Sequence, residues 1–335
     1  MTEHRPGGIL LQQIFEQLSD GKLHPGSELA AALGVSRTAV WKSIGALRAL
    51  GMAIESVPRQ GYRVLHPFTP LSADRIAARF DAHTQAALCD GAVLWSTTST
   101  NALLLSRPAP PPGRCEYRIA EHQSAGRGRR GRSWLAAPGG ALCLSVSWSY
   151  AALPPDVGAL SLAIGVGIWR VLRRFGLATP MLKWPNDVFL GARKLCGVLL
   201  ELRAEVAGPA LVVVGIGLNC QLDDLSRRQV GDTGTEPADL FDAGATEVDR
   251  NQWAAALITE TVATLQAFGE TGFASFLDDW RAADALTGKA VSVRGVQGEI
   301  PGIAAGIDAD GALQVQTAAG MQRFTSGDVS VRTQS

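Results

Sequence analysis

The segment Glu121 to Trp134, EHQSAGRGRRGRSW, carries the densest set of groups suited to chemistry. Within it, four arginines are interleaved with three glycines over residues 126–132. Glycine lets the backbone bend closely around a ligand, and guanidinium groups meet phosphate or carboxylate oxygens through paired hydrogen bonds. The segment therefore predicts a site for an anion.

Three other interpretations fit this segment taken alone. GRGRRG matches the G-x-G-x-x-G pattern of dinucleotide-binding folds, but a helix should then begin there and an acid should follow about 20 residues later. Pro138 and two glycines follow instead, and the first acid is Asp156, outside a strand-helix-strand unit. A basic nucleic-acid surface and a solvated loop stay open as alternatives.

A second segment is KWPNDVFLGARKLCG, residues 183–197. Lys194 follows a strand-like VFL run and precedes the apolar run LCGVLLEL, where a lysine is partly desolvated and needs a counter-anion. The alternative is an edge lysine whose amine extends to water, beside a plain Pro-Asn-Asp turn.

Two further segments carry small or flexible groups. STTSTN, residues 96–101, follows an apolar run and either holds a polar head group or caps a helix that starts at Ala102. VVVGIGLN, residues 212–219, is typical of a buried strand in which Gly215 and Gly217 let a ligand or another backbone approach closely.

Regular elements must bring these segments together. Between residues 115 and 220, β-rich runs alternate with an apolar helical stretch near 159–175, which predicts a mixed α/β unit with a sheet covered by helices. Residues 72–88, 251–269 and 272–286 are predicted to be helical.

The two ends of the chain have their own patterns. Residues 8–64 predict three short amphipathic helices, and LAAALGVSRTAVWKSIGAL is typical of a helix-turn-helix in which Ser36 caps the third helix. A turn at Pro58 to Gly61 between two β-like runs predicts a wing, and HPFTPL predicts a linker. The last 50 residues contain short strands separated by DADG and SGD turns, which indicate a small β-barrel or sandwich.

Composition limits the class of protein. The 335 residues favour two or three domains, and 31 basic and 31 acidic residues cancel, so that any nucleic-acid surface is local. The five cysteines are scattered without a metal-ligand spacing and are expected to be buried free thiols. Neither a signal peptide nor a membrane-spanning run is found, so a cytoplasmic protein without membrane contact is expected.

Four motifs, in their order along the chain, resemble those of the biotin-protein ligase family: STN, Q-x-x-GRGRRGR-x-W, KWPND with RK-x-x-G, and GIGLN. The resemblance runs from about residue 8 to 332. The N-terminal segments LGVSRTAVWK and GYRV also match this family. The chain therefore resembles its bifunctional members, in which a biotin operon repressor is fused to the ligase. We therefore expect an α+β multidomain protein with three domains. These are a winged helix-turn-helix domain (1–66), a mixed α/β ligase domain of the class II synthetase-like, biotin/lipoate ligase type (67–285) and a small SH3-like β-barrel (286–335).

The resemblance implies roles for particular residues. The expected biotin contacts are Ser99, Thr100, Asn101, Gln123, Arg127, Gly128, Arg129 and Lys194. The expected ATP or adenylate contacts are Arg127, Arg129, Arg132, Lys194 and Asn219. The expected catalytic residues are Lys194, Arg129 and Asp187. In the family, a loop with an aromatic residue covers adenine. In the corresponding residues 221–250, this sequence offers Pro237 or Phe241 for that contact.

The resemblance also implies an activity and partners. The expected enzyme uses ATP and Mg²⁺ to form biotinyl-5'-AMP and transfers biotin to a lysine of the biotin carboxyl carrier protein of acetyl-CoA carboxylase. Mg²⁺ would arrive with ATP, without a protein-only metal cage. A homodimer bound to biotinyl-AMP would bind biotin operon DNA. The expected DNA contacts are Ser36, Arg37, Thr38, Trp41, Lys42 and Arg59.

Two other functions remain in view. A lipoate-protein ligase shares the reaction class and the KWPND segment, but its ligand loop is not of the GRGRRGR type. A biotin- or lipoate-sensing DNA-binding regulator without transfer activity belongs to another class. Lys194, Arg127 and Arg129 favour the enzyme, because a sensor has no need of catalytic cations.

Overall fold

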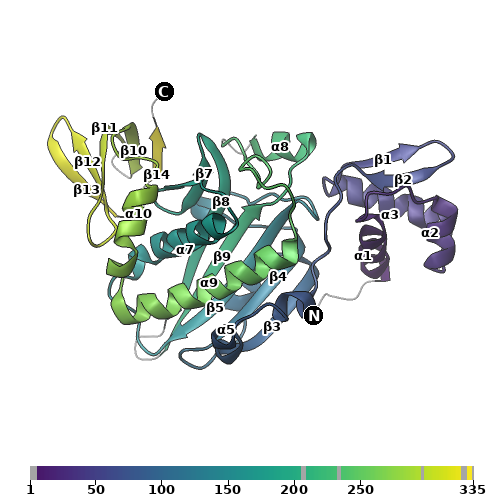
Figure 1. Cartoon of the computed structure of the whole chain (residues 1–335), viewed down its shortest axis with the longest axis horizontal. Helices are drawn as coiled ribbons and strands as arrows, with labels where there is room; N and C mark the ends of the chain where they lie inside the picture. Colours follow the sequence, from purple (N-terminus) through teal and green to yellow (C-terminus); the bar gives the residue numbers. More distant parts are fainter. Residues whose placement is uncertain (1–5, 205–208, 232–234, 296–297, 326–329, 334–335) are drawn as a thin grey trace.

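The computed structural model describes residues 6–204, 209–231, 235–295, 298–325 and 330–333. The chain forms three units in a row (Figure 1). Three helices and a hairpin lie at one end, a large sheet with its helices lies in the middle, and the last strands lie at the other end. In the part of the chain that the structure describes, no helix is both long and apolar enough to cross a membrane.

The first unit contains helices α1 (Pro6–Leu18), α2 (Gly26–Ala32) and α3 (Arg37–Ala49), followed by strands β1 (Ile54–Val57) and β2 (Gly61–Val64). The two strands pair as an antiparallel hairpin. The predicted helix-turn-helix and the predicted turn between two strands are therefore confirmed.

Short-range interactions explain where the helices of this unit begin and end, and the predicted cap at Ser36 is one of them. Gly34 separates α2 from α3 with φ +65°, a backbone angle that favours glycine. Ser36 Oγ accepts a hydrogen bond from Ala39 N and so caps α3. The apolar faces of the three amphipathic helices pack into a separate small core that includes Ile14, Leu18, Leu29, Val40, Ile44 and Leu47.

A seven-stranded sheet organises the central unit, which confirms the predicted α/β arrangement. Its strands, in spatial order, are β3 (Leu88–Thr97), β4 (Cys115–Gln123), β5 (Ala141–Tyr150), β9 (Ala210–Asn219), β8 (Arg193–Ala204), β7 (Asp187–Leu190) and β6 (Met181–Lys183). Strands β3 and β4 are parallel, and the other neighbouring strands are antiparallel.

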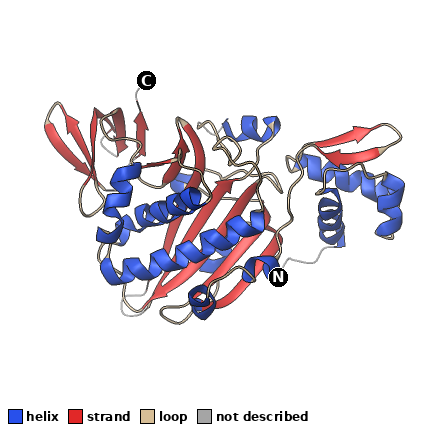
Figure 2. Cartoon of the chain, viewed as in Figure 1, coloured by secondary structure: helices blue, strands red, loops and turns tan. Residues whose placement is uncertain are grey.

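Helices cover both faces of this sheet. Figure 2 shows α7 (Leu160–Arg174) and α9 (Arg250–Thr271) lying side by side across one face. On the other face lies α6 (Thr100–Leu105), whose Leu104 packs against strand β9. Because side chains alternate across a strand, Val146 of β5 joins the core under α7 and α9, whereas Ser145 points toward α6.

Two predicted helices are interrupted. In place of one helix over 72–88, the structure has α4 (Ala73–Ala77) and α5 (Ala82–Ala87), because Asp81 accepts a hydrogen bond from Thr84 N and starts a new helix. Residues 272–286 contain only a short 3₁₀ turn and α10 (Leu277–Ala283). The remaining helical segments are α8 (Asp224–Gly231) and the 3₁₀ turns η1 (Arg129–Gly131), η2 (Val157–Ala159) and η3 (Ala274–Phe276).

The last unit is an antiparallel sheet. Its spatial order is β13 (Gly320–Phe324), β12 (Leu313–Thr317), β11 (Gly298–Ile307), β10 (Ala290–Gly295) and β14 (Ser330–Thr333). The predicted DADG turn joins β11 to β12, whereas the predicted SGD turn lies outside the described residues. Trp184 Nε1 donates to Gly311 O at 3.1 Å, so the DADG turn docks on the KWPND segment. Apolar residues of β10 and β12 continue the core of the central unit.

Candidate active site

One cavity beside α6 brings together four segments of the chain. They carry STN, the Arg/Gly run, KWPND with RK-x-x-G, and GIG. Strands β5, β8 and β9 form its floor, and residues 126–134, called here the Arg/Gly loop, lie against it. All eight residues expected to contact biotin line this cavity: Ser99, Thr100, Asn101, Gln123, Arg127, Gly128, Arg129 and Lys194. The tertiary structure thus gathers residues from four distant segments.

The start of α6 supplies neutral polar groups. Ser99 caps the helix by accepting from Ala102 N. Gln123 Oε1 accepts hydrogen bonds from Thr100 N at 2.8 Å and from Thr100 Oγ1 at 3.1 Å. The capping interpretation therefore holds for Ser99, although the helix begins at Thr100 and not at Ala102 as predicted. Thr100 lies in a hydrogen-bonded wall of the cavity.

Glu201 is a site residue that the sequence analysis did not identify. It lies on β8, where its Oε2 accepts from Asn101 Nδ2 at 2.8 Å, and its carboxylate is 3.4 Å from Arg127 Nη2. Asn101 is also held by Ser145 Oγ, which lies 2.5 Å from Asn101 Oδ1. A carboxylate inside the apolar run VLLEL was the available signal, because such a group needs a partner.

Replacing Glu201 by glutamine should raise the affinity for biotin. The amide keeps an acceptor for Asn101, but Arg127 loses a competing negative charge and meets a ligand anion more readily. Since exposed ion pairs contribute about 0.2–1 kcal/mol, we expect the KM for biotin to fall by up to about fivefold with little change in kcat. Steady-state adenylation kinetics check this, and Glu201→Ala, which also releases Asn101, should instead raise the KM. An unchanged KM in the glutamine variant would contradict the role of Glu201.

Lys194 has the environment predicted for it. It lies on β8 with its side chain 26% exposed, and its Nζ is 2.7 Å from Asp187 Oδ1 on the neighbouring strand β7. The same Nζ lies 5.8 Å from the centre of the Trp134 ring. The lysine is therefore partly buried and has the expected counter-anion.

Arg129 is the second cation held in place. Its Nη1 donates to Asn186 Oδ1 at 3.1 Å, and Asn186 Nδ2 in turn donates to Val198 O at 2.6 Å. Burial lowers the pKa of the Arg129 guanidinium, an effect that the nearby Asp187 opposes. Asn186 is thus a positioning residue within KWPND, and the Pro-Asn-Asp turn is more than a plain turn.

Two glycines of β9, Gly215 and Gly217, allow close approach as predicted, but the approaching groups are side chains and not a ligand or another backbone. A Cβ at Gly215 would lie 2.5 Å from Asn101 Oδ1, and a Cβ at Gly217 would lie 2.3 Å from the Trp134 ring. These distances are shorter than van der Waals contact, so a side chain at either position would displace the residue opposite. The close approach is made here by cavity-lining side chains.

The Arg/Gly loop is closed by its own backbone. Gly128 N donates to Arg132 O at 2.7 Å, and Trp134 N donates to Gly126 O at 2.9 Å. Arg130 has φ 59°, which fits the tight turn. The loop leads into β5 and not into a long helix, which excludes the dinucleotide-fold interpretation. Arg132 is exposed and lies outside the lining of the cavity, so its contact with a nucleotide stays a prediction.

Asn219 lies behind Lys194. It is 2% exposed, and its Nδ2 donates to Lys194 O at 3.3 Å and to Ala238 O at 2.9 Å. These bonds hold Pro237 beside Lys194, with which it forms a parallel bridge. Phe241 lines a different cavity, near the linker. Of the two candidates for an adenine contact, Pro237 is therefore the one next to Lys194.

Cysteines and metal-binding groups add little to the site. Four cysteines are buried, but Cys89 is exposed, which corrects the expectation that all five are buried. Burial raises the pKa of the cavity-lining Cys143 thiol to about 11, so it is a neutral group near pH 7. Among the described residues, no three His, Cys, Asp or Glu side chains are grouped to hold a metal ion.

The expected DNA contacts form an exposed surface on the first unit. All six lie on the exposed side of α3 or on the hairpin: Ser36, Arg37, Thr38, Trp41, Lys42 and Arg59. Trp41 is 64% exposed, although it is a large apolar side chain. These residues are therefore accessible, and their contact with DNA stays a prediction.

The three units match three known families of domains. Residues 10–63 match an HTH domain, residues 91–219 match the Biotin/lipoate A/B protein ligase family, and residues 287–332 match the Biotin protein ligase C terminal domain. A structure of "Biotin protein ligase from Aquifex aeolicus in complex with biotin and ATP" has a TM-score of 0.61 at 25% identity, covering 73% of this chain and 99% of that one. The fold and site are those of a biotin or lipoate ligase joined to a helix-turn-helix domain.

Full-length relatives narrow this class. "Bifunctional ligase/repressor BirA" of Salmonella typhimurium is 37% identical, and that of Escherichia coli is 36% identical; each alignment covers 96% of this chain and 97% of the relative. "Biotin--[acetyl-CoA-carboxylase] ligase" of Mycobacterium tuberculosis is 35% identical over 71% of this chain and 87% of its own length. The chain belongs to the bifunctional ligase/repressor family of biotin-protein ligases.

Proposed function

We propose that this protein activates biotin with ATP, transfers it to a lysine of the biotin carboxyl carrier protein of acetyl-CoA carboxylase, and represses biotin biosynthesis genes. One observation carries the enzymatic part: the eight expected ligand residues line a single cavity. That cavity combines neutral polar groups on α6 with the cations Lys194, Arg127 and Arg129. A carboxylate substrate and a phosphate group both need such cations.

In the first step, a biotin carboxylate oxygen forms a bond to the α-phosphorus of ATP, and the bond from that phosphorus to pyrophosphate breaks. Two anions approach each other, so fixed positive charge lowers the barrier. Lys194 and Arg129 supply it, and Asp187 orients the Lys194 amine through their 2.7 Å contact. Removing one such group costs about 3–4 kcal/mol of transition-state stabilisation.

Mg²⁺ accompanies ATP in this proposal. Magnesium in nucleotide sites takes one or two protein carboxylates and several phosphate or water oxygens. Asp187, which pairs with Lys194 beside the cavity, would supply one carboxylate ligand to the ion; the alternative role of Asp187 is to orient the incoming lysine amine. The ion would neutralise charge on the phosphates.

In the second step, the carrier lysine forms an amide bond to the biotinyl carbon, and AMP leaves with the electrons of the broken acyl–oxygen bond. The lysine attacks as the neutral amine and releases one proton to water as the amide forms; if Asp187 does not hold the ion, it would orient that amine. Biotinyl-adenylate is a mixed anhydride that water destroys, so the Arg/Gly loop must cover it. An anion bound to its arginines offsets the entropy cost of ordering the loop.

The regulatory part joins DNA binding to this ligand. Residues 1–66 would act as a winged helix-turn-helix, with residues 67–285 as the ligase and 286–335 as an SH3-like barrel. We further propose that biotinyl-AMP promotes a homodimer, as a dimer brings two recognition helices onto two half-sites. Within the described sheet, residues 199–203 of β8 pair with β9 on one side and have no strand partner on the other. Such an edge is suited to pairing with a second copy. Because ATP and operator DNA are both found in the bacterial cytoplasm, the proposal locates the activity of this protein there.

Incubation with radiolabelled biotin, Mg-ATP and a biotin carboxyl carrier domain tests the enzyme. We expect label on the carrier, in an amount that depends on ATP. Labelled adenylate without transfer would favour a sensor, and efficient transfer of lipoate in a parallel reaction would favour the lipoate-protein ligase.

A DNA titration of the full-length protein at fixed salt tests the repressor. Biotin and ATP should tighten binding to operator DNA by about tenfold, within the usual range of allosteric coupling. Equal affinity with and without the ligands would remove the repressor and leave the ligase.

A further inference from the structure

Buried side chains of the ligase unit hold the linker that follows the DNA-binding unit. Arg250 Nη1 donates to Thr69 O at 3.3 Å, and Asn251 Nδ2 donates to Pro70 O at 3.0 Å. Ser72 N donates to Asn251 Oδ1 at 2.7 Å. The predicted linker is therefore bonded to the start of α9 by consecutive backbone groups.

One ion pair joins this linker to both strands that flank the Arg/Gly loop. Glu121 and Arg250 are 6% and 1% exposed and form two hydrogen bonds, of 2.7 and 3.2 Å. Glu121, on β4 before the loop, also accepts from Leu71 N at 2.9 Å. Arg250 also donates to the carbonyl of Ala141, the first residue of β5 after the loop, at 3.0 Å. The linker, β4 and β5 thus meet at a single buried pair.

A second contact continues from the linker to α1. A Cβ at Gly139, which has φ +80°, would lie 3.0 Å from the Phe68 ring, so the backbone after the loop packs directly on Phe68. The Phe68 ring lies 4.6 Å from that of Phe15 in α1, and Phe15 lies 4.9 Å from Trp95 of β3. The DNA-binding unit is consequently docked on the part of the linker that the ion pair positions.

We propose that Glu121 and Arg250 are positioning residues that couple ligand binding at the Arg/Gly loop to the linker and to α1. The inference rests on the proposed binding of biotin and ATP at the loop. When the ligands order residues 124–140, β4 and β5 become fixed at Glu121 and Ala141, and the shared ion pair fixes Thr69 and Leu71 with them. The DNA-binding unit then receives the ligand state through its linker.

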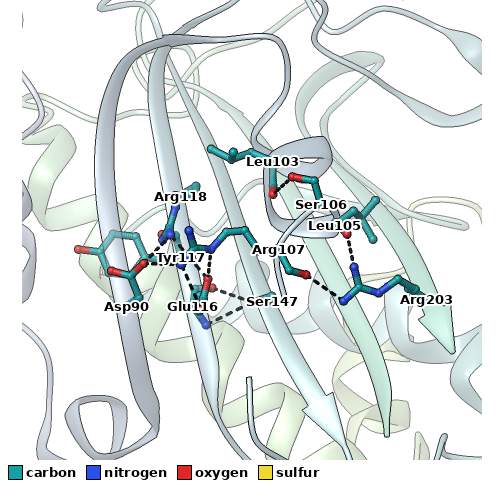
Figure 3. Close-up of polar contacts among 10 residues, drawn as sticks. All are labelled: Asp90, Leu103, Leu105, Ser106, Arg107, Glu116, Tyr117, Arg118, Ser147 and Arg203. Atoms are coloured by element: carbon teal, nitrogen blue, oxygen red, sulfur yellow. Dashed lines mark hydrogen bonds and ion pairs between the residues drawn. The ribbon is translucent and has the colours of Figure 1, made fainter. Parts of the chain in front are cut away.

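The same strand offers a matched control. Glu116, near the other end of β4, is also a largely buried carboxylate in an ion-pair cluster, with Arg107 at 2.7 Å and Arg118 at 3.6 Å (Figure 3). Arg107 also bonds Asp90 on β3. These contacts run toward β3 and away from the loop and the linker. Glu116→Gln therefore changes a similar group without touching the proposed coupling.

Hydrogen exchange measured by mass spectrometry on the full chain, with and without biotin plus ATP, tests the proposal. In the unmodified protein, exchange should slow by at least about fivefold at residues 124–140 and also at residues 66–72 and α1, the lower end of typical coupling. In Glu121→Gln, residues 124–140 should still respond, but the linker and α1 should respond by less than about twofold. Glu116→Gln should behave like the unmodified protein.

A second variant keeps the test decisive if Glu121→Gln is unstable. Glu121→Leu combined with Arg250→Met removes both charges together, and apolar replacements of a buried pair commonly preserve stability. It should remain folded, with a melting temperature lowered by the loss of the bonds to Leu71 N and to the carbonyls of Thr69 and Ala141, and it should show the same loss of linker response. A wild-type linker response in this folded double variant, or an equal loss in Glu116→Gln, would overturn the coupling role alone. Absence of any response at residues 124–140 in the unmodified protein would overturn the proposed function and the inference together.

Discussion

Replacing Lys194 by alanine should nearly abolish formation of biotinyl-adenylate while leaving the fold intact. Lys194 Nζ is a cavity cation held 2.7 Å from Asp187, and its side chain is only partly buried, so its loss leaves no large void. The charge that develops on phosphate oxygens would lose a fixed partner. We expect the rate to fall by about 10²–10³-fold, the usual effect of removing one such donor.

Biotin-dependent exchange of labelled pyrophosphate into ATP measures this step directly. Lys194→Met keeps the apolar stem without the charge and should be as inactive as the alanine variant. Lys289→Ala removes an exposed lysine of the same chain and should be fully active. Near-normal exchange in Lys194→Ala, with an unchanged melting temperature, would show that the lysine has no catalytic role.

Valine at position 217 should close the cavity to biotin. A Cβ there would lie 2.3 Å from the Trp134 ring, and the two γ-methyl groups need further space. Overpacking a well-packed site costs about 1–3 kcal/mol, which corresponds to roughly 5- to 150-fold in affinity for biotin if Trp134 moves into the cavity.

Isothermal titration with biotin checks this expectation. Gly158→Ala is the matched control, because a Cβ at that exposed position has no atom within 4 Å, and it should bind biotin normally. Normal biotin affinity in a folded Gly217→Val protein would mean that Trp134 has room to withdraw, and that the close approach at Gly217 does not limit the cavity.

Residue types and local spacing predicted a site for an anion and a lysine that needs a counter-anion, whereas the particular biotin contacts followed from the resemblance to the biotin-protein ligases. Glycine alternating with arginine, and paired glycines in an apolar strand, permit close approach of a ligand, although each pattern taken alone left other interpretations open. Local spacing also predicted the cap at Ser36 and the core of the first unit, because these depend on neighbours within a few residues. Lys194 was predicted to need an anion, and Asp187 provides it.

Residues that act through long-range contacts were not predictable in this way. Glu201 lies 100 positions from Asn101, and Asn186 lies 57 positions from Arg129, so no local spacing relates them. The division of residues 72–88 into two helices follows from the cap at Asp81, where local hydrogen bonding outweighs helix propensity.

The linker shows most clearly what the sequence determines and what only the tertiary structure decides. The prolines of HPFTPL determine that the chain leaves regular structure there, since proline lacks a backbone donor. Whether that segment is loose or fixed depended on partners 50 to 181 residues away, Glu121, Arg250 and Asn251. The sequence by itself thus determined the elements and the chemical types of the site. Only the tertiary structure decided which charges meet, because a buried backbone group or ion accepts whichever partner the packed fold brings within hydrogen-bond distance.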